Sequence, residues 1–211
     1  MMMAMNPVDV TLFLKAMLVG LSIAAPVGPI GLLTIQRTLQ RGMPAGLATG
    51  LGAASADAVY GAVGAFGVTS VVAALTSARL PLSVAGGALL LWLAWQTWRA
   101  PLADQAAQVA GSEVSLWAQF AGTFALTLSN PATILSFVAI FASLSATFSG
   151  AASPLVLLCG VFLGSALWWL LLATGVARLR HSFTPAWRVR INRLSAGCLA
   201  VFALWQWVSL V

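Results

Sequence analysis

The sequence predicts an all-α integral membrane protein with six transmembrane helices, arranged as two inverted three-helix repeats. Hydrophobic residues make up 61% of the 211-residue chain and charged residues only 7%, whereas a soluble domain is typically about 25% charged. At about 20 apolar residues per span, the chain has room for six helices and short loops. Two proline-containing interruptions at corresponding places in the two halves favour a repeat.

Six apolar stretches predict the spans, at approximately Val10–Ile35, Pro44–Val68, Leu82–Trp98, Leu116–Phe148, Pro154–Ala177 and Ile191–Val211. The second stretch begins with proline, which suits a first helical position because its missing amide proton has no acceptor there. The fourth stretch is too long for one straight helix, as expected if a proline divides it.

The net charge of +6 comes from arginines clustered between spans, a pattern typical of membrane topology and not of a nucleic-acid-binding surface. The positive-inside rule places the three basic loops, 36–43, 99–115 and 178–190, in the cytoplasm and both termini outside. We therefore expect a single membrane domain with one repeat at about 8–98, a second at about 116–211, and the polar loop 99–115 between them. An odd number of spans per half inverts the second repeat.

The two interruptions are the main indication of function. They lie in the first and fourth predicted spans and consist of Pro26-Val27-Gly28-Pro29 and Ser129-Asn130-Pro131. In hydrocarbon, a broken helix is tolerated only where protein or a water-lined cavity covers the freed backbone groups. Paired broken spans are the best sequence indication of a transporter's binding site, and a half-helix starting at such a break presents amides that suit a carboxylate.

Asp57 is the only acidic residue well inside a predicted span. An acid at that depth costs at least about 2.5 kcal/mol on insertion scales, so it normally faces a cavity or a partner. Gly42, Gly46 and Gly50 precede it at four-residue spacing and predict close helix packing. Because Asp57 lies about two turns beyond Gly50, we expect it to face the helix bundle. The alternative is a neutral aspartic acid that only joins two helices.

Other residue types leave two further functions open. Cys159 and Cys198 lie in different spans, and a membrane thiol-disulfide carrier needs two cysteines that can meet. A metal-ion exporter needs several oxygen ligands, more than one intramembrane carboxylate supplies. The single histidine, His181, falls in a basic loop, so neither a zinc site nor another cofactor site is expected. No enzymatic activity is expected.

Together these residues resemble the lysine/homoserine exporter (LysE/RhtB) family of amino-acid efflux proteins. The resemblance rests on the Pro26–Pro29 motif, on the glycines leading to Asp57, and on the segment Asn130–Phe137. Two residues depart from the family pattern: Val27 intrudes in the first motif, and Ala132 replaces the usual lysine after Asn-Pro. The resemblance implies export of amino acids or related metabolites from a bacterial inner membrane, driven by the proton gradient.

These two lines of reasoning give one mechanistic hypothesis. Asp57 attracts the ammonium group of an amino acid, and the amides of the broken helices near Pro29 and Asn130 attract its carboxylate. Because Asp57 holds either a proton or the substrate's cation, outward substrate movement is coupled to inward proton movement. The expected partners are a small-molecule solute, protons and the lipid bilayer. The glycine faces suit a homodimer and packing within one chain equally well.

Overall fold

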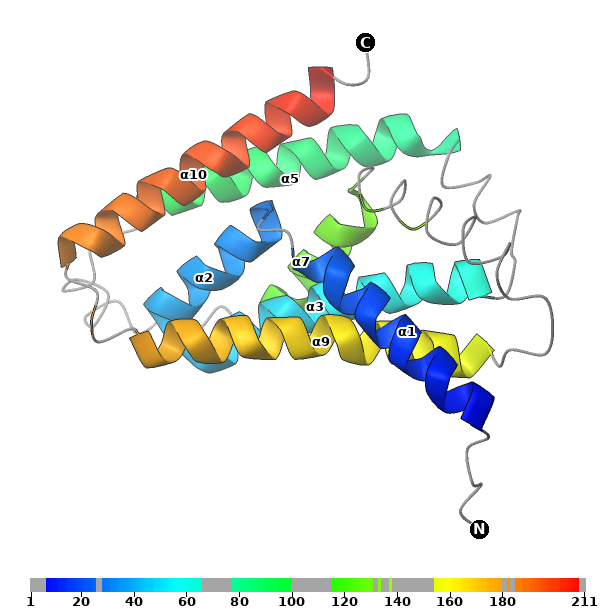
Figure 1. The fold of residues 1–211 in the computed structure, drawn as a ribbon. Helices are drawn as coiled ribbons and strands as arrows, with labels where there is room; N and C mark the ends of the chain where they lie inside the picture. The colour runs from blue at the N-terminus through cyan, green and yellow to red at the C-terminus, as the bar shows by residue number, and fades with distance from the viewer. Residues whose placement is uncertain are drawn as a thin grey trace.

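In the computed structural model, the residues described are 7–25, 28–65, 77–99, 115–130, 133, 137, 154–179, 182 and 185–208. Their regular structure is helical, which confirms the all-α class. Figure 1 shows the helices, whose bounds are α1 Pro7–Ala24, α2 Pro29–Arg41, α3 Met43–Ala65, α5 Arg79–Arg99, α7 Leu116–Leu128, α9 Pro154–Leu179 and α10 Pro185–Val208.

The helices form two packed pairs with shorter helices between them (Figure 1). α5 lies beside α10, α3 lies beside α9, and α1 packs across α9. α2 and α7 occupy the space between the two pairs, where α2 contacts α3, α9 and α10 while α7 packs mainly on α3. This arrangement places the short helices that flank both interruptions at the centre of the bundle.

Two of the described helices, α5 and α9, are long and apolar enough to cross a membrane, and the bent pair α1 and α2 is a third candidate if it forms one broken span. The axes of α1 and α2 differ by 79°. α1 ends at Ala24 and α2 begins at Pro29, where proline's fixed φ and missing amide proton suit the first helical position. α7 ends at Leu128, just before Asn130.

Two of the expected loops are wrong in extent. Residues 36–41 continue α2, and Gly42 alone joins α2 to α3. Glutamine and arginine are good helix formers, and a glycine with φ of 88° suffices for the turn. Similarly, most of 178–190 is helical, because α9 continues to Leu179 and α10 begins at Pro185. Of the third basic loop, residues 100–114 lie outside the described residues.

Gly42 also departs from the expected glycine face, because it lies in the turn before α3. The other two glycines face different neighbours: Gly46 packs against Thr38 of α2, and Gly50 packs against Trp169 of α9. Of the three glycines at four-residue spacing, Gly46 and Gly50 therefore allow helix contacts, and Gly42 forms a turn.

Close approach of α1 and α9 depends on two further glycines, Gly160 and Gly164. A Cβ atom at Gly160 would lie 2.8 Å from the carbonyl oxygen of Phe13, and one at Gly164 would meet the backbone of Met17. Small residues four apart are the usual means by which membrane helices approach each other closely. Because the obstacle is backbone, it cannot move aside as a flexible side chain would.

We predict that Gly164→Ala destabilises the protein, since overpacking typically costs about 1–3 kcal/mol. The matched control is Gly175→Ala on the same helix, where a Cβ atom meets nothing within 4 Å and alanine's better helix propensity is worth about 0.5–1 kcal/mol. Thermal unfolding in detergent should therefore show a lower midpoint for the first variant and an equal or higher one for the second. Equal midpoints would show that α1 and α9 do not depend on this contact.

Candidate functional site

Asp57 is buried in α3, with 3% of its surface exposed. The Ser165 hydroxyl of α9 donates a hydrogen bond of 2.7 Å to Asp57 Oδ2. The Trp169 indole N–H donates in turn to Ser165 Oγ at 3.2 Å. A buried carboxyl group is tolerated only when its oxygens are hydrogen-bonded, so Ser165 and Trp169 are part of the carboxyl site. Sequence reasoning identified Asp57 and missed both partners.

Glycines on the same face of α3 make room for this site. Gly50 and Gly61 lie about two turns before and one turn after Asp57. A Cβ atom at Gly50 would overlap the Trp169 side chain, whereas one at Gly61 would lie 3.6 Å from Val161. A side chain at position 50 would therefore collide with Trp169, whose N–H donates to Ser165.

Tyr60 connects the carboxyl-bearing helix to the end of α7. It lies three residues after Asp57 and so on the same helix face. Its hydroxyl donates a 2.6 Å hydrogen bond to the carbonyl oxygen of Leu128, the last residue of α7. Its ring stacks on Phe137 with centroids 5.5 Å apart. The end of α7, where the second interruption begins, is thus held by the helix that carries Asp57.

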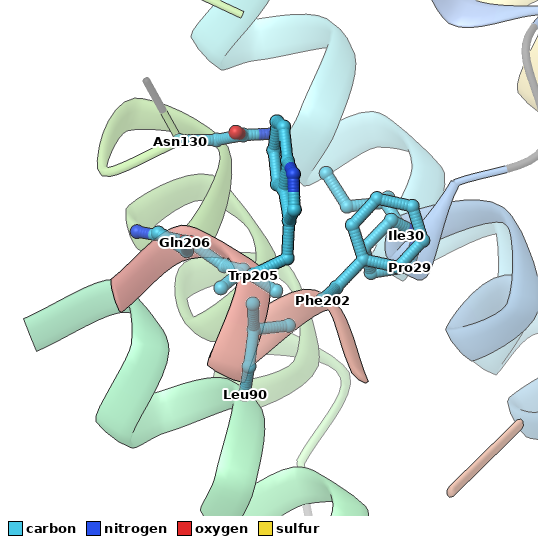
Figure 2. A pocket seen from close by; sticks show the side chains of 8 residues that line it. Pro29, Ile30, Leu90, Asn130, Phe202, Trp205 and Gln206 are labelled. Carbon is cyan, nitrogen blue, oxygen red and sulfur yellow. The ribbon is translucent and has the colours of Figure 1, made fainter. Parts of the chain in front are cut away.

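The two interruptions meet at a small cavity of about 40 Å³. Pro29 and Ile30 line it from the start of α2, and Leu126 and Asn130 line it from the end of α7 and just beyond. α5 and α10 supply the rest of the wall: Leu90, Phe202, Trp205 and Gln206. Figure 2 shows the Trp205 ring between Asn130 on one side and Phe202 on the other. Asp57 is not among the lining residues, so the carboxyl group and the helix ends are neighbouring features and not one pocket.

The structure describes two of the four remaining expected site residues, Gly28 and Ser129. Gly28 precedes α2 with extended backbone (φ −95°, ψ −165°) and no side chain caps the helix, so the first amides of α2 lack an intrahelical acceptor. The Ser129 hydroxyl instead donates to the Ala125 carbonyl at 2.8 Å. Pro26 and Pro131 lie outside the described residues.

Arg37 is the polar residue that sequence reasoning missed most clearly. It lies in α2, and its Nη1 donates to Thr49 Oγ1 of α3 at 2.9 Å, to Thr123 Oγ1 of α7 at 3.1 Å and to the Gln119 carbonyl at 3.3 Å. No local signal in the sequence indicates these partners, because they lie 12 to 86 residues away along the chain.

We predict that Ser165→Ala lowers the free energy of unfolding by about 1–3 kcal/mol, because it leaves a buried carboxyl oxygen without its donor. Ser195→Ala is the matched control: both serines are fully buried, but Ser195 Oγ has no hydrogen-bond partner among the described residues. Thermal unfolding in detergent compares the two. A Ser195 variant that loses as much stability as the Ser165 variant would show that the hydrogen bond to Asp57 contributes nothing.

Several known proteins are similar to this chain over most of its length. The chain is similar to the membrane protein YahN of Escherichia coli (strain K12), with 31% identity over 81% of this chain and 77% of that protein. It is 30% identical to the chemotactic transduction protein ChpE of Pseudomonas aeruginosa over 89% of this chain and 91% of the relative.

A third relative, at 27% identity over 81% of this chain and 82% of its own, is the Bacillus subtilis protein named "Putative amino acid efflux protein YcgF". None of the solved structures matches the chain. Residues 21–206, nearly the whole sequence, match the family described as LysE type translocator. The chain therefore belongs to the LysE type translocator family of membrane proteins and is a transporter, not an enzyme.

Proposed function

We propose that the protein exports amino acids or related small metabolites across the bacterial inner membrane in exchange for protons. The observation that carries this proposal is the hydrogen-bonded carboxyl group of Asp57, buried in a helix that also holds the end of α7 through Tyr60. The name of the Bacillus subtilis relative supports the substrate class.

The two charged groups of an amino acid match the two features in chemistry, and the proposal requires a conformation in which these features adjoin, because they do not form one pocket in this structure. A helix N-terminus carries a partial positive charge and unpaired amides, which suit a carboxylate. α2 offers such an end beside Asn130, at the wall of the small cavity. The ammonium group then needs an acidic partner, and Asp57 supplies one on α3, about one helix turn before the Tyr60 that holds the end of α7.

The hydrogen bonds of Asp57 are compatible with both of its protonation states. Ser165 donates to the carboxylate in the arrangement observed. A hydroxyl oxygen has two acceptor positions, so Ser165 can accept from a protonated Asp57 while it still accepts from Trp169. Proton binding and release then need only a rotation of the Ser165 hydroxyl. An ammonium group and a proton compete for the same carboxylate, and this competition couples solute export to proton entry.

We further propose the six-span topology of two inverted repeats, at about 8–98 and 116–211, with the basic segments facing the cytoplasm. Neither alternative function gains support. Cys159 and Cys198 are free thiols on different helices, one exposed and one half-buried. Among the residues that the structure describes, no three His, Cys, Asp or Glu side chains gather as a metal site would require.

We predict that Asp57→Asn severely reduces transport driven by a pH gradient, because an amide keeps the size of the carboxyl group but carries no negative charge to attract an ammonium group and binds no proton at neutral pH. The measurement is uptake of a panel of amino acids into proteoliposomes with an imposed pH gradient, after a cellular export screen has identified the solute. A rate reduced at least about tenfold, equivalent to 1.4 kcal/mol, is expected.

Lys15→Gln is the control, since Lys15 is exposed on α1 and belongs to neither feature. It should transport like the unaltered protein. Undiminished proton-coupled transport by Asp57→Asn, with the control also active, would remove Asp57 from the mechanism.

A further inference from the structure

A second and larger cavity, of about 450 Å³, opens between α2, α5 and α7. We call it the vestibule. Three arginines line it, Arg37 and Arg41 from α2 and Arg99 from α5, together with four glutamines and a threonine; none of the lining residues is acidic. Its size falls in the usual range for small-molecule sites, about 300–1,000 Å³. The combination of positive charge and amide groups suits a small oxyanion.

Arg37 is held in an orientation that leaves its other donors available. All of its hydrogen bonds among the described residues use Nη1, which donates to α3 and α7. A guanidinium carries five N–H donors in a fixed plane, so Nε and Nη2 remain for a ligand. These two groups form the edge that binds a carboxylate with two parallel hydrogen bonds. Because Arg37 is already immobilised, binding there costs little side-chain entropy.

Arg41 and Arg99 add charge at the rim of the vestibule, where both are exposed. Each lies in the last turn of its helix, where a positive charge is favoured by the helix dipole. The helix dipole explains why each arginine lies at the end of its helix, but not why both arginines line the same cavity. Arg41 lies one turn from Arg37, and like charges at that spacing repel. Neither rim arginine is paired with an acid in the described part of the chain, so a bound anion would relieve this repulsion.

The vestibule and the small cavity lie at opposite ends of α2, along the same three helices. The vestibule is lined by Leu33, whereas the small cavity is lined by Leu90 and Leu126. These three leucines belong to one buried cluster, which separates the two spaces. Between α2, α5 and α7, the vestibule therefore lies at the C-terminal end of α2, the apolar cluster lies in the middle, and the small cavity lies at the N-terminal end of α2.

We propose that the vestibule is the entrance at which the carboxylate of the exported solute is captured, and that it selects amino acids of zero or negative net charge over cationic ones. This inference rests on the proposed export function. It also uses the expectation that the arginine-rich end of α2 faces the cytoplasm, from which an exporter takes its substrate. Lysine-like solutes are disfavoured, because their extra positive charge would approach three arginines.

A binding experiment tests the vestibule directly. The protein is placed in phosphatidylcholine nanodiscs, and equilibrium binding of glutamate, leucine and lysine is measured at pH 7. We expect affinity to fall in that order, and the double variant Arg41→Gln/Arg99→Gln to weaken glutamate binding about tenfold. Arg178→Gln removes a charge from the exposed end of α9, outside the vestibule, and should bind glutamate normally. Tightest binding of lysine, or unchanged glutamate binding by the double variant, would overturn the proposal.

Anionic lipid headgroups offer the same oxyanion chemistry as a carboxylate solute. The binding measurement is therefore repeated in nanodiscs containing phosphatidylglycerol. Retained glutamate binding supports a solute site. Complete competition by the anionic lipid, with no preference for glutamate in phosphatidylcholine, would assign the arginines to lipid binding and overturn the proposal.

Transport measurements separate this inference from the proposed function. If proteoliposomes export amino acids and the double arginine variant leaves KM for glutamate unchanged, the vestibule proposal fails while the export function stands. If glutamate binds in an arginine-dependent way but no amino acid is transported by the unaltered protein, the vestibule stands as a carboxylate site and the export function fails. The expected result is an increase of about tenfold in KM for glutamate with a smaller change for leucine.

Discussion

The arrangement of helices depends on one constraint: a polar group inside an apolar bundle must find its partner within the protein. In this chain the partners lie on other helices. α2 shows this best, because its polar residues reach four neighbours. Each contact fixes which helix lies beside which, in a bundle where apolar surfaces alone distinguish poorly between neighbours. Among the described residues, the polar contacts that join helices include Gln36 with Thr97, Arg37 with Thr49, Thr123 and the Gln119 carbonyl, Gln40 with Asn192, Asp57 with Ser165, Tyr60 with the Leu128 carbonyl, and Gln206 with the Ser83 carbonyl.

The functional features lie in two groups of helices. The carboxyl site lies where α3 contacts α9, and both cavities lie between α2, α5 and α7. The Tyr60 hydroxyl links the carboxyl-bearing helix to the end of α7 by its hydrogen bond to the Leu128 carbonyl. A solute that occupied the small cavity would thus lie beside a helix end whose position is set from α3.

Local physical rules were sufficient for some of the structure. Composition predicted a helical membrane protein, the first proline motif predicted an interrupted helix, and the cost of an intramembrane acid predicted a buried Asp57. The expected loop 36–43 was wrong because the partners of Arg37 lie 12 to 86 residues away, and no local pattern shows such contacts. Ser165 and Trp169 were unremarkable within an apolar helix for the same reason. The sequence also suggested one shared pocket, whereas side-chain packing separates Asp57 from the helix ends.

The one-residue connection at Gly42 has a mechanical consequence. Two helices joined by a single residue have little freedom to move separately, and Arg37 of α2 also donates a hydrogen bond to Thr49 of α3. We therefore expect a displacement of α2 to carry α3, and with it Asp57, in the same direction.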